Sequence, residues 1–332
     1  MNFVTVAELN KDIVRNLHHI PRDIDLIVGI PRSGMLVATL IALYLNKPLA
    51  DLDSFIAGKF QSVGRTKNTD KCVTKYEEIR KLLVVEDSCN SGNSVREACK
   101  KMEACNQKIE YLILAAYISH STKSLVDVYF RVVPQPRCFE WNFIHYKRFM
   151  EEACVDIDGV LCIDPSPSEN DDGEKYREFI RNAKPKYIPT TEIGWLVTSR
   201  LEKYREDTEY WLRKNNIKYG KLYMMNLNSA EERRKLGSHA KFKAEIFGKL
   251  HNARWFLESE PMQAEEIRKL TGKEVFCVDE MYIHDSGFRQ KIYWGIKEDY
   301  INKFRSILPQ KLRTKLRKIK RILLAQGKRK RK

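Results

Sequence analysis

Apolar residues occur in the first half of the chain as short, unbroken runs, each followed by a polar turn and a helix-length segment. The runs cover residues 25–30, 81–87 and 111–119, and the helical segments cover residues 35–46 and 94–105. Strands that are apolar on both faces are typical of parallel sheets, because helices cover both surfaces of such sheets. The pattern therefore predicts an α/β domain built on a parallel sheet.

The second half shows the same alternation, and a proline-containing segment, residues 132–149, links it to the first. We expect strands over residues 153–158, 193–199, 253–259 and 274–280, with helices between them that include residues 203–216 and 238–252. The expected fold class is α/β, with two Rossmann-like parallel-sheet domains over residues 1–149 and 150–298 and a basic amphipathic helical tail over residues 299–332.

The tail carries most of the net charge of the protein. The chain of 332 residues has a formal net charge of +16, from 60 basic and 44 acidic side chains. Residues 303–332 contain 14 Lys or Arg and no acidic residue, which leaves 46 basic and 44 acidic side chains elsewhere. Attraction to an anionic partner is therefore expected of the tail alone.

Apolar residues of the tail recur at spacings of three and four, with Pro309 as a break between two helices. These residues are Ile301, Phe304, Leu308, Leu312, Leu316, Ile319 and Leu323. A basic amphipathic helix is typical of binding to an anionic membrane surface, which we expect of residues 301–332. Nucleic-acid binding is less favoured, because Phe304 is the only aromatic residue of the tail, and a solvated tail is the third interpretation.

We expect a cytoplasmic protein that is peripheral at the inner face of the membrane. No apolar run approaches the ~20 residues that span a bilayer, and the first residues lack the basic start and apolar block of a signal peptide. The eight cysteines include no Cys-x-x-Cys pair, so reduced and mostly buried thiols are expected rather than zinc ligands or disulfides.

A polar loop with an acidic start, VVEDSCNSGNS, ends the second apolar run. Glu86 and Asp87 would lie where a ribose diol and its bound magnesium need oxygen partners, and the loop and following helix suit a phosphate. The segment resembles the diphosphoribose-binding signature of type I phosphoribosyltransferases, except that Asn93 replaces a glycine. The resemblance implies that phosphoribosyl diphosphate is bound by Glu86, Asp87, Ser88, Asn90, Ser91, Gly92, Asn93 and Ser94.

A second loop, GIPRSG, follows the first apolar run, where the same family places the loop that contacts diphosphate. Arg32 offers a fork of donors to a leaving diphosphate, and Ser33 and Gly34 complete the loop. Residues 58–76, which are polar and basic, resemble the family's mobile loop over the site. The alternative is a generic strand–helix turn in which the acidic pair only caps a helix.

The motif DIDGVL stands at the end of the first predicted strand of the second half. A carboxylate attacks a phosphoryl group only when magnesium screens their repulsion, and an Asp two residues later can protonate the leaving group and then activate water. Asp156 and Asp158 fit these roles. The motif looks like motif one of the haloacid-dehalogenase superfamily; a solvated turn is the alternative. Only residues 160–192 separate it from the next core strand, so we expect an open site without a large cap domain.

Further motifs follow in the order found in that superfamily. Thr198 would hold the phosphoryl group, and Lys243, or alternatively Lys241, would neutralise charge between phosphoryl group and nucleophile. Glu258 and Glu260 stand where the family commonly has magnesium-binding aspartates. The expected Mg²⁺ ligands are thus Asp156, Asp158, Glu258 and Glu260.

The order of the two modules resembles bacterial fusions found with surface-polysaccharide synthesis. The resemblance implies transfer of 5-phosphoribose from phosphoribosyl diphosphate to a glycan acceptor, expected to be lipid-linked, and then removal of the 5-phosphate to leave a ribofuranosyl residue. One alternative is a nucleotide-salvage phosphoribosyltransferase fused to a nucleotidase. The other is a regulator that senses phosphoribosyl diphosphate and binds nucleic acid.

Overall fold

The computed structural model describes residues 1–67, 73–105, 109–227, 232 and 239–284. Within these residues, Met1–His284 form one compact unit that contains two large sheets and one small sheet. No helix in this part of the chain is long and apolar enough to cross a membrane. The expected amphipathic tail and the last residues of the expected second domain lie outside the described residues.

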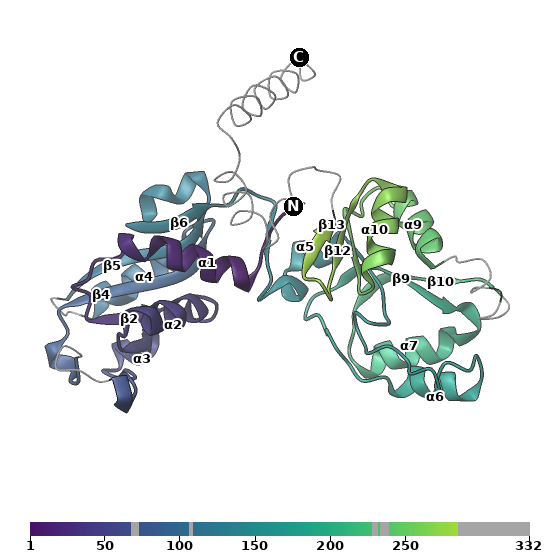
Figure 1. The fold of residues 1–332 in the computed structure, drawn as a ribbon, viewed down its shortest axis with the longest axis horizontal. Helices are drawn as coiled ribbons and strands as arrows, with labels where there is room; N and C mark the ends of the chain where they lie inside the picture. The colour runs from purple at the N-terminus through teal and green to yellow at the C-terminus, as the bar shows by residue number, and fades with distance from the viewer. Residues whose placement is uncertain (68–72, 106–108, 228–231, 233–238, 285–332) are drawn as a thin grey trace, which may run out of the picture. The chain divides into compact units, whose positions relative to one another are not determined.

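The first large sheet has the strand order β3-β2-β4-β5-β6, and all its strand pairs are parallel (Figure 1). Its strands are β2 (Leu26–Gly29), β3 (Leu49–Asp51), β4 (Lys81–Cys89), β5 (Glu110–Ile118) and β6 (Val128–Val132). Three of them, β2, β4 and β5, confirm the predicted apolar runs to within two residues at each end. The sequence analysis missed β3 and β6, because both are short and carry polar residues.

Side chains of the central strand β4 alternate between two faces that are both covered by helices. Leu83 and Val85 pack with residues of α1 and α2, whereas Leu82 and Val84 pack with residues of α3 and α4. The helices are α1 (Val6–Asn16), α2 (Gly34–Leu45), α3 (Leu52–Ile56) and α4 (Asn93–Ala104). The burial of both faces explains the unbroken apolar run in β4.

The second large sheet has the strand order β10-β9-β8-β11-β12-β13, with β13 antiparallel to β12 and the other pairs parallel. Its strands are β8 (Ala153–Val155), β9 (Ile193–Leu201), β10 (Tyr219–Met225), β11 (Trp255–Glu258), β12 (Glu274–Cys277) and β13 (Tyr282–His284). The four predicted strands are confirmed as β8, β9, β11 and β12, to within three residues at each end. The sequence analysis did not identify β10 and β13, the two edge strands.

Helices cover both faces of the second large sheet as well. Val155 and Leu257 pack with residues of α6 and α7, and Cys154 and Phe256 pack with residues of α9 and α10. The helices are α6 (Glu174–Asn182), α7 (Arg205–Lys214), α9 (His239–Lys249) and α10 (Pro261–Thr271). In residues 159–192, all of which are described, α6 is the one helix, and the segment is too short for a large cap.

The proline-containing segment that links the two halves contains regular structure. Strand β7 (Arg137–Phe139) pairs in parallel with β1 (Asn2–Val4), and helix α5 (Lys147–Glu151) begins near the end of the segment. Strand β7 was not predicted from the sequence, because its partner is at the start of the chain and a local pattern cannot show such a pairing. The predicted domain boundary near Phe149 stays a prediction.

Short 3-10 helices and free cysteines complete the described structure. The 3-10 helices are Leu17–His19, Arg65–Lys67, Tyr76–Glu78, His120–Leu125, Phe143–His145 and Glu202–Tyr204. The described cysteines are all free thiols; Cys89, Cys138, Cys154, Cys162 and Cys277 are buried, and Cys99 and Cys105 are half-buried. The expectation of mostly buried thiols is therefore confirmed for the described cysteines.

The core of the first sheet can be tested at Leu114, which is fully buried in β5. Leu114→Ala removes core atoms and leaves a cavity, so the free energy of unfolding should fall by about 2–5 kcal/mol. Leu43→Ala in α2 is the matched control, because this leucine is 74% exposed and should change stability by no more than about 0.5 kcal/mol. Urea unfolding followed by circular dichroism measures both, and equal losses would contradict the described packing.

Candidate functional site

The first candidate site lies at the carboxyl end of β4, where Glu86 and Asp87 are buried. The backbone N–H of Asp87 donates to Glu86 Oε1 at 3.0 Å, and the indole N–H of Trp141 donates to Asp87 Oδ2 at 2.7 Å. Burial, together with the neighbouring Asp87, raises the pKa of Glu86 to about 8. Glu86 therefore holds its proton to a higher pH than an exposed glutamate does, and a cation bound beside it would favour the ionised form.

The loop after β4 turns at Gly92 and begins helix α4 at Asn93. Gly92 has a φ of +79°, which L side chains rarely adopt, and a Cβ there would lie 2.3 Å from Leu125 Cδ1. Behind the loop, the N-terminus of α4 presents N–H groups and partial positive charge, which attract anions. Asn90, Ser91, Asn93 and Ser94 are exposed in this loop, and Ser88 is half-buried. The loop geometry fits the expected phosphate contacts.

The loop after β2 lies directly against the acidic pair. A Cβ at Gly34 would lie 2.6 Å from the carbonyl oxygen of Val85 and 3.3 Å from Glu86 Oε1, so a glycine permits this contact. Arg32 is exposed at the same turn and Ser33 is half-buried. The structure therefore brings together the two loops that the sequence analysis assigned to one site.

Three side chains near this site were not identified from the sequence. Arg96 donates to a backbone carbonyl of the loop at 2.9 Å. Trp141, the hydrogen-bond donor to Asp87, stacks on Phe139 with ring centroids 4.8 Å apart and an interplanar angle of 14°. Arg137 is buried, and its guanidinium lies over the Phe139 ring, 5.6 Å from the centroid. Arg137 and Phe139 belong to β7, and Trp141 follows this strand. The pairing of β7 with β1 therefore positions Arg137, Phe139 and Trp141.

The second candidate site lies at the carboxyl ends of the neighbouring strands β8 and β11. The ammonium group of Lys243, from α9, lies 2.6 Å from Asp156 Oδ2 and 2.7 Å from Glu258 Oε2. A third acceptor is Gln263 Oε1, at 3.1 Å. Lys243, Asp156 and Glu258 are all buried, as is Thr198 in β9. The buried ammonium group of Lys243 therefore holds together two other residues expected in one phosphatase site, Asp156 and Glu258, and Thr198 lines the same cavity.

Burial and charge act in opposite directions on this cluster. Burial alone would lower the pKa of Lys243, but Asp156 and Glu258 hold it above its ordinary value. Burial raises the pKa of Asp156, and Lys243 opposes that rise. Lys243 therefore stays protonated between the two carboxyl groups and supplies the positive charge of the site.

Asp158 has a different cationic partner, Arg200. The Arg200 Nη2 atom lies 2.6 Å from Asp158 Oδ1, and Nε lies 3.1 Å from Asp158 Oδ2. Burial alone would raise the pKa of Asp158, but the guanidinium of Arg200 lowers it below its ordinary value. Asp158 is therefore a carboxylate at neutral pH, the form that accepts a proton. Arg200 has no counterpart among the residues identified from the sequence.

The structure separates the alternatives that the sequence left open. Lys241 is exposed, whereas Lys243 is buried against Asp156. Glu260 caps helix α10, because its carboxylate accepts the backbone N–H groups of residues 262 and 263 at 2.9 and 2.7 Å. Of these alternatives, Lys243 and Glu258 are the residues that the structure connects to Asp156, because Lys243 forms ion pairs with both carboxyl groups.

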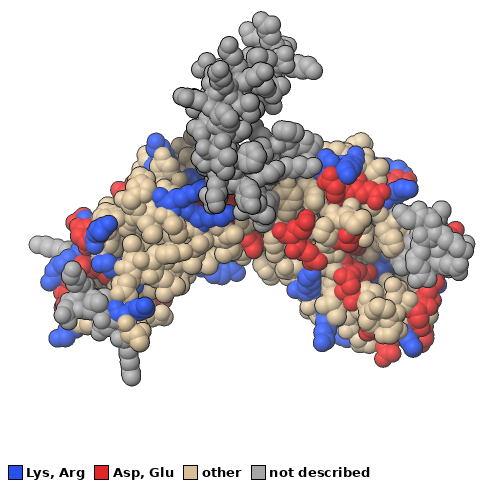
Figure 2. Space-filling model, viewed as in Figure 1, with Lys and Arg blue, Asp and Glu red and all other residues tan. Residues whose placement is uncertain are grey.

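A cavity of about 350 Å³ opens at this cluster, and Asp156, Asp158, Thr198, Lys243, Glu258 and Glu260 line it. Its lining also includes residues that the sequence analysis did not identify, among them Asp164, Asn170, Tyr176, His239 and Asp279. Figure 2 shows that acidic side chains gather on the surface of the half that contains β8–β13. This acidic surrounding favours a cation in the cavity.

Both candidate sites offer the hard oxygen ligands that Mg²⁺ prefers. Asp156, Asp158 and Glu258 line one cavity, and Glu86 and Asp87 are consecutive at the end of β4. These residues fit the expected magnesium ion, which stays an expectation. The carboxylate of Glu260 caps α10 and is the least suited of the four expected ligands.

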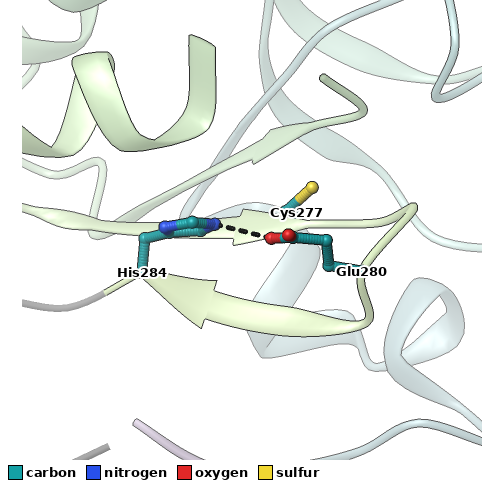
Figure 3. A group of neighbouring side chains, drawn as sticks. All are labelled: Cys277, Glu280 and His284. Atoms are coloured by element: carbon teal, nitrogen blue, oxygen red, sulfur yellow. Dashed lines mark hydrogen bonds and ion pairs between the residues drawn. The ribbon is translucent and has the colours of Figure 1, made fainter. Parts of the chain in front are cut away.

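Cys277, Glu280 and His284 form another group of ligand types, with ligand atoms within 4.8 Å of one another (Figure 3). The imidazole of His284 lies between two carboxylates, with Nε2 3.0 Å from Glu280 and Nδ1 3.1 Å from Glu265. The Cys277 thiol donates to the carbonyl oxygen of Ser259 at 3.3 Å, and burial raises the pKa of Cys277 to about 11. Hydrogen bonds account for these positions, and we assign no metal to the group.

Comparisons with known proteins identify the first half of the chain. Residues 3–147 match the model of the phosphoribosyl transferase domain family. The N-terminal part of the chain is a phosphoribosyltransferase domain. The matched residues include both loops of the first candidate site, whereas the second large sheet lies beyond them. No curated protein matches the chain.

Three solved structures show a weak similarity to the chain. A xanthine-guanine-hypoxanthine phosphoribosyltransferase of Helicobacter pylori is 18% identical, with a TM-score of 0.32, over 42% of this chain and 91% of its own. A purine phosphoribosyltransferase of Pyrococcus horikoshii is 16% identical, with a TM-score of 0.32, over 42% and 92%. A chain of a Pnkp1/Rnl/Hen1 complex is 17% identical, with a TM-score of 0.26, over 84% and 87%. Likenesses at this level do not extend to substrates.

The raised pKa of Glu86 predicts a pH dependence of stability. Between its ordinary value of 4.5 and about 8, the folded protein binds more protons at Glu86 than the unfolded chain does, so the free energy of unfolding falls as pH rises. Glu86→Gln should remove this contribution of Glu86 to the pH dependence. Thermal unfolding at pH 5 and pH 8 should therefore show that the variant loses less stability between the two pH values than the wild type does. Glu97→Gln, on the exposed face of α4, is the control. An unchanged pH dependence in Glu86→Gln would contradict the raised pKa.

Proposed function

We propose that this chain transfers 5-phosphoribose from phosphoribosyl diphosphate to a glycan hydroxyl and then removes the 5-phosphate, leaving a ribofuranosyl residue. The observation that carries the proposal is the presence of two sites in one chain. A phosphoribosyltransferase domain is followed by a buried cluster of Asp156, Lys243 and Glu258, which has the chemistry of an aspartyl phosphatase. A donor that carries a 5-phosphate yields a phosphorylated product, which the second site would dephosphorylate.

In the proposed transferase reaction, Glu86 and Asp87 bind the ribose diol of the donor, and the loop around Gly92 binds its 5-phosphate. Arg32 would bind the diphosphate, because a guanidinium is suited to donate two hydrogen bonds to phosphate oxygens. The oxygen of the acceptor hydroxyl bonds to the anomeric carbon and its proton is released to solvent. The bond from that carbon to the diphosphate breaks, the diphosphate leaves from the opposite side with the electron pair, and the configuration inverts. The close approach of Gly34 to Glu86 supports this assignment, because it brings the loop after β2 beside Glu86.

The proposed phosphatase would use the residues that the resemblance to the haloacid-dehalogenase superfamily implies. Asp156 would attack the phosphorus, while Lys243 and Thr198 would hold the phosphoryl oxygens. Asp158 would assist proton transfer. Glu258 would hold the ammonium group of Lys243 beside Asp156. A bound Mg²⁺ would screen the repulsion between the carboxylate of Asp156 and the phosphate. The short segment between β8 and β9 leaves the cavity open, which suits a phosphate on a large glycan.

Nucleotide salvage is the competing function, and Trp141 is the observation that favours it. Its indole ring lies beside Asp87, where a planar nucleobase could stack. An acceptor assay separates the two proposals. With phosphoribosyl diphosphate and magnesium, we expect a glycan product and no nucleotide from purine or pyrimidine bases; nucleotide formation alone would favour salvage.

The composition of the tail supports a proposal for where in the cell the enzyme acts. Its 14 basic residues and apolar stripe would attach the enzyme to the anionic inner face of a membrane, where lipid-linked glycans are assembled. We therefore propose a cytoplasmic, peripheral enzyme with a lipid-linked acceptor. Nucleic acid is the less favoured partner.

Asp156→Asn separates the two reactions. The substitution keeps the shape of the side chain but removes the nucleophile, so dephosphorylation should stop while transfer continues, and the product should accumulate with its 5-phosphate. Mass spectrometry of the glycan product measures this. The control is the double variant Glu86→Ala and Asp87→Ala, which should lose transfer but still hydrolyse p-nitrophenyl phosphate. A fully dephosphorylated product from Asp156→Asn would remove Asp156 from its proposed role.

Truncation after Tyr300 tests the proposed membrane attachment. Each basic residue near an anionic surface contributes about 1 kcal/mol at low ionic strength, so the full chain should sediment with phosphatidylglycerol vesicles and the truncated chain should not. Transfer to a soluble acceptor should continue in both, and transfer to a lipid-linked acceptor in vesicles should fall in the truncated chain. Equal sedimentation would contradict the proposal, and RNA retention that depends on the tail would favour nucleic acid.

A further inference from the structure

Arg200 is a fully buried arginine in β9, two residues after Thr198. Its Nη2 lies 2.6 Å from Asp158 Oδ1, and its Nε lies 3.2 and 3.1 Å from the two carboxylate oxygens. The other edge of the guanidinium is held as well, with Nη1 3.4 Å from Thr208 Oγ1 and Nη2 3.4 Å from Cys162 Sγ. Because both edges are held, the guanidinium fixes the orientation of the carboxylate.

Arg200 also contacts Thr198, another residue that lines the cavity. The backbone N–H of Arg200 donates to Thr198 Oγ1 at 3.2 Å. Cys162 Sγ lies 3.5 Å from Asp158 Oδ1 and supports the carboxylate from its own loop. Arg200 therefore sets the position of Asp158 relative to Thr198, and both residues line the cavity with Asp156.

Stability alone does not account for a buried ion pair at this place. Replacing a buried ion pair with apolar residues of similar volume is often neutral or stabilising, because both charges lose their hydration. The pair links a strand end to the loop that carries Asp158, and Asp158 lines the same cavity as Asp156 and Lys243. The location of the ion pair therefore favours a role in the proposed phosphatase reaction.

We propose that Arg200 is a positioning residue of the phosphatase, which holds the Asp158 carboxylate where it accepts a proton from the water that attacks the aspartyl phosphate. This inference rests on the proposed phosphatase function and adds a residue to it. In the first step, Asp156 bonds to phosphorus and the ester oxygen leaves. In the second step, the water oxygen bonds to phosphorus and one of its protons passes to Asp158. The bond from phosphorus to Asp156 breaks, and its electron pair returns to the carboxylate.

The two steps depend differently on Asp158 when p-nitrophenyl phosphate is the substrate. The p-nitrophenolate group leaves without a proton, so the first step does not need Asp158. Attack by water needs the correctly placed carboxylate, because general base catalysis contributes about 10²–10⁴-fold to such a step. Loss of Arg200 should therefore slow the second step selectively.

The experiment measures p-nitrophenolate release by the full chain with Mg²⁺ and compares Arg200→Met with the wild type. We expect kcat to fall about 100-fold, KM to fall with it, and kcat/KM to change less than about threefold. The first turnover should give a burst of one p-nitrophenolate for each enzyme molecule. Mass spectrometry after acid quenching should find the phosphoryl group on Asp156.

Two further variants complete the test. Arg200→Lys keeps the charge but not the planar fork, so it should show a smaller fall in kcat and a burst of the same size. This variant also serves if Arg200→Met does not fold. Arg205→Met is the matched control, because Arg205 pairs with Glu202 and Glu209 and does not line the cavity. It should keep the wild-type kcat and show no burst.

Equal falls in kcat and kcat/KM without a burst, in either Arg200 variant, would overturn the positioning role. Failure of the proposed function gives a different result. If the wild-type chain does not hydrolyse p-nitrophenyl phosphate, or if Asp156→Asn still does, the phosphatase function itself is wrong.

Discussion

The second half of the protein depends on one buried ammonium group. Val155 of β8 pairs with Leu257 of β11, so the next residues, Asp156 and Glu258, are neighbours at the carboxyl ends of the two strands. Two carboxylates brought together in the protein interior repel each other unless a cation lies between them. Lys243 provides that cation, within 2.7 Å of both. The parallel pairing of β8 and β11 and the packing of α9 therefore create the site together.

The first half also places two consecutive acidic residues at a strand end, and the buried guanidinium of Arg137 interacts electrostatically with one of them, Asp87. Glu86 is surrounded by buried groups and by Asp87, and its pKa rises to about 8 as a result. Glu86 thus holds its proton to an unusually high pH until a cation and a donor bind, whereas the proposed phosphatase cluster already contains the ammonium group of Lys243. This contrast fits the proposed function, in which the transferase site is completed by its substrates and the phosphatase site is preformed.

Most of the sheet strands and both loop motifs could be predicted from the sequence, because strands buried on both faces give unbroken apolar runs. The alternation of Leu82, Leu83, Val84 and Val85 between two covered faces shows why such a run exists. Short edge strands such as β3 and β13 give no such signal, because too few of their residues are buried.

Residues that depend on distant pairing were not predicted. Trp141 reaches Asp87 only because β7 pairs with β1, and Arg200 reaches Asp158 only because β9 lies beside β8. The choice of Glu258 over Glu260 required the structure too, because both residues follow the same apolar run and only one of them caps α10.

The proposal that both sites act in turn on the same ribose is tested most directly by a doubly labelled donor. Phosphoribosyl diphosphate would carry a carbon label in its ribose and a phosphorus label in its 5-phosphate, and the wild-type chain would receive it with magnesium and a lipid-linked glycan. We expect the carbon label on the glycan and the phosphorus label released as inorganic phosphate in equal amount. Retention of both labels on the product, or their joint transfer to a nucleobase, would contradict the proposed function.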